Sequence, residues 1–145
     1  MRKNIKNYTS EAKVENTVAH IEELVIKKMN ARQFFKEYKN GHLDGIVFVV
    51  PTDKGDLPFK MPARVEKVEK LVGNIDQARR TAWKNIHDWI DAQVALIETE
   101  QVKVEEVFLP YMAYPNGQTL FEVMEQGGFK MPQLPSAPED GEVLP

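Results

Sequence analysis

A stretch from about residue 75 to about residue 98 constrains the fold more than any other part of this sequence. Apolar side chains recur there at helical spacing and cover about half of the helix, whereas a surface helix needs a stripe only a little wider than about 100°. The eight positions are Ala78, Ala82, Trp83, Ile86, Trp89, Ile90, Val94 and Ile97. Asn74 and Gln77 match a capping box, which typically opens a helix. We therefore expect a long central helix against which the rest of the chain packs.

Three strands are expected before this helix, at residues 32–39, 42–50 and 57–61. Asn40 and Gly41 lie between the first two, and this dipeptide is typical of a two-residue hairpin turn. The second strand ends in five consecutive apolar residues, a pattern of strands that are buried on both faces. Pro58 cannot donate a ladder hydrogen bond, which predicts an edge position for the third strand. The sequence therefore predicts a three-stranded antiparallel meander.

Three shorter helices are expected at residues 14–28, 62–72 and 119–124. Ser10 precedes the first of them and suits a helix start. The second is expected to open at its proline, because proline is favoured in the first turn of a helix. Residues 102–114 fit either a strand or irregular structure, since two prolines flank or interrupt their apolar pattern.

The predicted fold class is α+β. It consists of a three-stranded antiparallel meander packed against an N-terminal helix and a long central helix, in the order α-β-β-β-α-α, with a C-terminal extension. A chain of 145 residues suffices for one hydrophobic core, and we assign residues 1–129 to a single domain. Residues 130–145 hold four of the nine prolines and three acidic residues. Because such a segment buries little apolar surface, we expect it to be disordered.

Composition excludes several classes of protein. The net charge is −3, so no overall basic field draws the chain to nucleic acid or to a membrane surface. There is no cysteine, which excludes disulfides, thiolate nucleophiles and thiolate metal sites. No apolar run approaches the roughly 20 residues of a membrane helix, and the N-terminus lacks a signal-peptide pattern. The sequence predicts a cytoplasmic protein with no membrane partner.

Five short strings give a resemblance that extends along most of the chain. They are KNYTS at 6–10, IEEL at 21–24, RTAWK at 80–84, DWIDAQ at 88–93 and FLPY at 108–111. With these strings, the chain up to about residue 129 resembles a widespread family of small uncharacterised proteins from phages, prophages and mobile elements. The resemblance implies a bacterial host cell as the setting. It implies no activity, and no catalytic or binding residues carry over from it.

The sequence does not predict an enzyme. The three histidines fall in three separate expected elements, at His20, His42 and His87. No zinc-protease motif, nucleophile elbow or phosphate-binding loop is present. His20 with Glu23, and Asp88 with Asp91, are spaced three residues apart, and we interpret both pairs as solvated helix faces. We therefore expect no catalytic residues, no metal ligands and no cofactor.

A short basic cluster suggests contact with nucleic acid. Arg79, Arg80 and Lys84 lie near the start of the long helix, where exposed backbone N–H groups add positive potential for an anion. The order helix, three strands, helix is similar to that of double-stranded-RNA-binding domains. The alternative is that these cations only surround a buried Trp83. The leading hypothesis is a non-enzymatic binding protein that acts in a nucleic-acid transaction, by binding nucleic acid or its machinery.

A second hypothesis is a protein-binding inhibitor of a host process or of a bacterial defence system. Its basis is a group of large apolar residues in a stretch with little regular structure: Phe108, Leu109, Tyr111, Met112 and Tyr114. Such residues are enriched at interfaces when they are exposed. The alternative is that they close one end of the core.

A third hypothesis is a small-nucleotide-binding protein, with a pocket lined by Trp83, Trp89 and the nearby cations. A homodimer built on the wide apolar face of the long helix is a further possibility.

Overall fold

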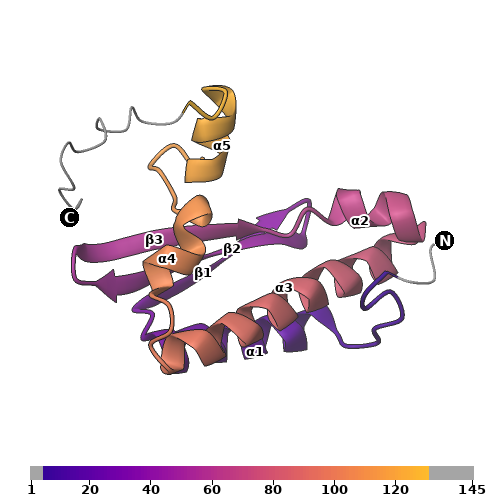
Figure 1. Cartoon of the computed structure of the whole chain (residues 1–145). Helices are drawn as coiled ribbons and strands as arrows, with labels where there is room; N and C mark the ends of the chain where they lie inside the picture. Colours follow the sequence, from indigo (N-terminus) through magenta and orange to yellow (C-terminus); the bar gives the residue numbers. More distant parts are fainter. Residues whose placement is uncertain (1–4, 131–145) are drawn as a thin grey trace, which may run out of the picture.

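A three-stranded antiparallel sheet and two long helices form the body of the protein (Figure 1). The computed structural model describes residues 5–130. Its elements are α1 (Val14–Met29), β1 (Gln33–Lys39), β2 (His42–Thr52), β3 (Gly55–Pro62), α2 (Val65–Val72), α3 (Ile75–Glu98), α4 (Val104–Phe108), a single 3-10 turn (Leu109–Tyr111) and α5 (Leu120–Gln126). The α+β class and the order of the elements are confirmed. No helix among the described residues is long and apolar enough to cross a membrane.

The sheet has the order β1-β2-β3, so β2 is central and β3 lies at an edge, as predicted. Asn40 and Gly41 join β1 to β2, and both have the positive φ that a primed hairpin turn requires (52° and 79°). The register places Phe34, Phe48 and Phe59 side by side across the three strands. Because paired residues share a face, these rings lie on the face that packs against the helices.

The core lies between this face of the sheet and the pair α1 and α3, which run side by side beneath it (Figure 1). Ile21 of α1 and Trp83 and Ile90 of α3 are fully buried. The prediction that α3 is the central packing element is confirmed by the seven buried residues that it contributes, from Ala78 to Val94. Most of its apolar face is buried inside the protein, so packing within the chain accounts for the width of this face.

Phe108 closes one end of this core. Its ring is fully buried and meets Phe48 edge-on, with ring centroids 5.4 Å apart. Trp89 also meets Phe108 edge-on, at 5.2 Å, and contacts Tyr111 at 6.0 Å. Edge-to-face pairs at these distances stabilise a core beyond the area they bury.

Two expectations about the elements are wrong. Pro62 does not open a helix, because it pairs with Gly45 as the last residue of β3, and Ala63 continues the ladder with a hydrogen bond to the carbonyl of Asp44. The helix α2 begins later, at Val65. Residues 102–114 are not a strand but contain α4 and the 3-10 turn, followed by isolated bridges from Met112 to Phe59 and from Ala113 to Thr119.

Side-chain capping differs among the starts of α5, α3 and α1. Thr119 and Glu122 form a complete capping box at the start of α5. Asn74 accepts a hydrogen bond from the backbone of Gln77 at 2.9 Å, but the Gln77 side chain does not return to Asn74. Ser10 does not cap α1, whose first flanking residue is Lys13. At the candidate site the Gln77 side chain instead donates to the backbone carbonyl of Ser10. Residues 131–145, for which the sequence predicts disorder, lie outside the described residues.

Candidate functional site

The N-terminal strap, residues 5–13, is a non-helical segment that lies along the first half of α3. Its Ser10 carbonyl accepts two hydrogen bonds from α3. One comes from Nε2 of Gln77 at 3.1 Å and the other from Nε of Arg80 at 3.2 Å. Arg80 also donates to the side-chain oxygen of Gln77 at 2.8 Å, which fixes both side chains relative to each other.

Asn7 is the second attachment point of the strap. Its backbone is in the left-handed region (φ 63°), which asparagine tolerates better than most residues. This turn presents the Asn7 carbonyl to the hydroxyl of Thr81, which donates to it at 2.9 Å. The Asn7 side chain donates to Asn85 at 2.9 Å and to the Asp88 carboxylate at 3.0 Å. The strap is therefore held by side chains over three turns of α3.

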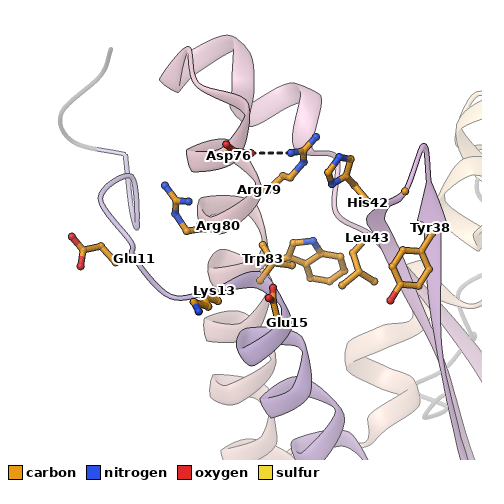
Figure 2. Close-up of a pocket in the computed structure, with 12 residues that line it drawn as sticks. Glu11, Lys13, Glu15, Tyr38, His42, Leu43, Asp76, Arg79, Arg80 and Trp83 are labelled. Carbon is orange, nitrogen blue, oxygen red and sulfur yellow. Dashed lines mark hydrogen bonds and ion pairs between the residues drawn. The ribbon is translucent and has the colours of Figure 1, made fainter.

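A cleft of about 560 Å³ opens between the strap, the β1–β2 hairpin and the first turns of α3 (Figure 2). Tyr38 and His42 of the hairpin face it from one side. Glu11 and Lys13 of the strap border it on the other, and Trp83 forms its floor. The volume lies within the range of about 300–1,000 Å³ that is typical of small-molecule sites.

The floor of the cleft holds an unsatisfied hydrogen-bond donor. Trp83 is fully buried, and its indole nitrogen has no hydrogen-bond partner among the described residues. In Figure 2 this nitrogen points toward the space beneath Arg79 and His42. Buried polar groups in folded proteins are almost always paired, so an unpaired one needs an explanation.

The two arginines of the cleft differ in their partners. Arg79 donates to the Asp76 carboxylate at 3.0 Å, so its charge is largely neutralised (Figure 2). Arg80 contacts only neutral groups, the Ser10 carbonyl and Gln77, and no carboxylate within residues 5–130 forms an ion pair with it. Arg80 therefore keeps a net positive charge in a fixed orientation. The acidic Glu11 and Glu15 also line the cleft, so its overall charge is mixed.

The basic cluster predicted from the sequence is not a single cationic patch. Arg79 and Arg80 both line the cleft, but Lys84 lies one turn further along α3 and pairs with Asp88 at 3.1 Å. Of the three predicted cations, only Arg80 has no carboxylate partner in the part of the chain that the structure describes.

The apolar segment predicted to bind a partner divides into buried and exposed residues. Phe108 is fully buried, so its assignment to an exposed patch is wrong: its ring is needed to close the core. Tyr111 and Met112 are half-buried against the same core. Leu109 and Tyr114 are exposed, at 46% and 38% of their surface. Trp89 is part of the Phe108 cluster and does not line the cleft.

A chain of three polar side chains lies beside the strap and was not predicted. His87 of α3 contacts the Asp88 carboxylate through Nδ1 at 3.0 Å. Its other ring nitrogen, Nε2, contacts Nδ1 of His20 on α1 at 2.5 Å. Burial opposes ionisation of Asp88, but hydrogen bonds from His87, Asn7 and Lys84 outweigh this and lower its pKa from 3.8 to about 2. No sequence pattern pairs positions 20 and 87, and the sequence alone shows only that His87 and Asp88 are adjacent.

Comparisons with known proteins give no match from which a function could be assigned. No protein-family model matches the chain. No curated protein and no solved structure matches it either. Within residues 5–130, no group of three or more histidine, aspartate or glutamate side chains is placed to hold a metal ion.

Proposed function

We propose that this chain is a non-enzymatic binding protein whose cleft takes a small ligand with a planar, hydrogen-bond-accepting ring and an anionic group, as in a small nucleotide. The observation that carries the proposal is the buried, unpartnered indole N–H of Trp83 at the floor of the cleft. An unsatisfied buried donor costs about 1–3 kcal/mol, and an acceptor on a ligand ring would recover this.

The remaining walls suit the other parts of such a ligand. Tyr38 and His42 offer ring faces against which a planar base can stack. Arg80 offers a guanidinium whose charge no described carboxylate neutralises. Its Nε and one terminal nitrogen are already engaged, which holds the group in place before a ligand arrives, so little side-chain entropy is lost on binding.

A small ligand fits these contacts better than a nucleic-acid backbone. Binding to duplex DNA draws its affinity from several cations that neutralise successive phosphates. Here Arg79 and Lys84 are each paired with a carboxylate, so two of the three predicted phosphate contacts would first require an ion pair to break. A cation without a carboxylate partner among the described residues, beside an aromatic floor, is instead typical of a pocket.

Titration of nucleotides tests the proposal. A panel of nucleoside mono-, di- and triphosphates and cyclic nucleotides is titrated by calorimetry. Arg80→Gln should weaken binding about tenfold or more, because hydrogen bonds to charged groups contribute about 1.5–3 kcal/mol. Arg32→Gln is the control. It removes an exposed cation that directly precedes β1 and pairs with Asp56, and it should leave the affinity unchanged. Binding of no nucleotide in the panel, or equal effects of the two substitutions, would sink the proposal.

A second candidate function rests on exposed apolar residues at the C-terminal end of the described chain. Phe121 and Met124 of α5 are exposed at 39% and 38%, close to Leu109 and Tyr114 in the sequence. Exposed groups of this kind are typical of protein interfaces. This surface supports binding to a host or phage protein. Light scattering of the protein alone, and of a Phe121→Ser, Met124→Ser double variant, shows whether the surface already self-associates.

A further inference from the structure

The chain Asp88, His87, His20 connects a half-buried carboxylate to an exposed histidine. The two histidines lie 67 residues apart in sequence, with ring centroids 4.7 Å apart. His87 is buried, with 8% of its surface exposed, whereas His20 is exposed. A half-buried carboxylate, an oriented imidazole and an accessible group at the end have the arrangement in which proteins activate a nucleophile.

The hydrogen bonds define which ring nitrogens carry protons when both imidazoles are neutral. Asp88 is ionised at neutral pH and can only accept, so Nδ1 of His87 must donate to it. Lys84 lies 3.5 Å from the same nitrogen and is too far away to compete with the carboxylate at 3.0 Å. Nε2 of neutral His87 is then an acceptor, and Nδ1 of His20 must donate to it. Nε2 of His20 is therefore left with a free lone pair.

The His20 side chain lines a small pocket of about 330 Å³. His20, His87 and Lys84 line the pocket, together with Asn16 and Thr17 of α1. Within residues 5–130, no protein group forms a hydrogen bond with Nε2 of His20. Lys84 lines the same pocket, and the His20 side chain is exposed.

We propose that His20 is a phosphoacceptor, whose Nε2 takes a phosphoryl group from a small phosphoryl donor. This site is separate from the ligand cleft and does not depend on the proposed nucleotide binding. The Nε2 lone pair attacks phosphorus and forms the N–P bond. The bond from phosphorus to the leaving group breaks, and its electron pair departs with that group. The Nδ1 proton of His20 passes to Nε2 of His87, and the resulting imidazolium is held by the Asp88 carboxylate.

The geometry assigns a role to each neighbour in this step. His87 removes the positive charge that builds on the His20 ring as the N–P bond forms, and Asp88 stabilises the proton that His87 receives. Lys84 also lines the pocket and helps to hold the Asp88 carboxylate in place through an ion pair at 3.1 Å. A histidine pair that only tied α1 to α3 would leave His20 no more reactive than any other exposed histidine.

The chain contains its own control, because His42 is also exposed and has no side-chain hydrogen bond within the described residues. The whole protein is incubated with potassium phosphoramidate at about pH 8, where an unperturbed imidazole is neutral. Phosphorylation of each histidine is followed by mass spectrometry, and the isomer is identified by phosphorus NMR. We expect His20 to react at least about tenfold faster than His42 and to carry the group on Nε2. Equal rates at the two histidines, or a product on Nδ1 of His20, would overturn the proposal.

His87→Phe tests the relay itself. In this variant a phenyl ring replaces the imidazole, so an aromatic group stays in place but the proton acceptor is lost. The rate of phosphorylation at His20 should therefore fall to that at His42. A rate at His20 that is unchanged in the folded variant would show that His87 plays no part. Thermal unfolding shows whether the variant folds. If it does not, Asp88→Asn is used, in which the same fall is expected because a neutral amide stabilises the imidazolium less well than a carboxylate does.

Discussion

Trp83 combines full burial with an indole N–H that has no partner among the described residues. Substitution by phenylalanine removes this donor and keeps most of the apolar contact. We expect Trp83→Phe to lower the free energy of unfolding by only about 1 kcal/mol, because removal of the unsatisfied donor offsets part of the lost packing. The same change should weaken nucleotide binding about fivefold or more, since the ligand loses one hydrogen bond.

Trp89→Phe is the matched control for this substitution. Trp89 packs against Phe108 and does not line the cleft. Urea denaturation should show a comparable loss of stability in the two variants, whereas calorimetry should show weaker nucleotide binding for Trp83→Phe alone. A Trp83→Phe protein with undiminished affinity would mean that the indole N–H does not face the ligand.

Asp88 makes stability depend on pH in the acid range. Its pKa in the folded protein is lowered from 3.8 to about 2, so its contribution is fully present above pH 3.8 and is lost as the pH falls toward 2. After allowance for solvent screening at a carboxylate with 26% exposure, we expect the loss to be about 1–2 kcal/mol. Asp88→Asn should lack this part of the acid dependence.

Urea denaturation at several pH values between 2 and 6 measures this dependence for the protein and its variants. Asp91→Asn is the control, because Asp91 is exposed and forms no ion pair within residues 5–130. At neutral pH, Asp88→Asn should also be less stable than Asp91→Asn, since His87 and Lys84 lose their anionic partner. Identical pH profiles for the two variants would contradict the role assigned to Asp88.

At the scale of elements, the sequence predicts most of the fold because its strongest signals are local. The helix α3 follows from apolar spacing, and its bounds agree with Ile75–Glu98. The hairpin follows from Asn40 and Gly41, whose positive φ few other residues adopt easily. The prediction that Pro62 opens a helix is wrong because the fixed φ of proline suits a strand end as well as a helix start. Here the pairing with Gly45 on β2 makes Pro62 the end of a strand. Such pairing is a tertiary contact that no local pattern contains.

The start of α5 depends on Thr119, which is almost fully buried and caps the helix. Its hydroxyl accepts a hydrogen bond from the backbone of Glu122 at 3.2 Å, and its own backbone N–H donates to the Glu122 carboxylate at 3.0 Å. This backbone hydrogen bond lowers the pKa of Glu122, so the charged form is the one that the cap holds. We expect Thr119→Ala to cost about 1–2 kcal/mol.

Thr119→Ser keeps the hydroxyl and should retain most of the stability that Thr119→Ala loses. Hydrogen exchange gives the local readout: amides of α5 (Leu120–Gln126) should lose protection in Thr119→Ala, while those of α3 keep theirs. Equal protection of α5 in both variants would indicate that packing, and not the cap, holds this helix.

At the scale of the whole molecule, the candidate site was only partly predictable. Arg79, Arg80 and Trp83 were found because they are neighbours on one helix. The rest of the cleft comes mainly from the strap, the start of α1 and the β1–β2 hairpin, which meet α3 only after folding. The strap itself is attached through backbone carbonyls of Asn7 and Ser10, and every residue type has a carbonyl. Contacts of this kind leave no signature in a sequence.

Thr81 attaches the strap to α3, and a substitution at this position removes the attachment. Its hydroxyl donates to the Asn7 carbonyl and accepts from Gln77, which in turn holds Ser10. Thr81→Val keeps the shape of the side chain but removes its hydrogen bonds to the half-buried Asn7 and Gln77, so we expect a loss of about 1–3 kcal/mol. The strap should then exchange its amides faster than the core. Nucleotide affinity should fall as well, since the strap forms one wall of the cleft.

Thr17→Val separates this effect from the general cost of altering a buried threonine. Thr17 is buried on α1 at 7% exposure, and its hydroxyl makes no side-chain hydrogen bond within residues 5–130. Hydrogen exchange of the strap should be unchanged in Thr17→Val and faster in Thr81→Val. If exchange of the strap is the same in both variants, the hydroxyl of Thr81 does not hold it. The strap would then stay in place through the packing of Ile5 and Tyr8 against the core, and the cleft would keep its wall without the polar contacts.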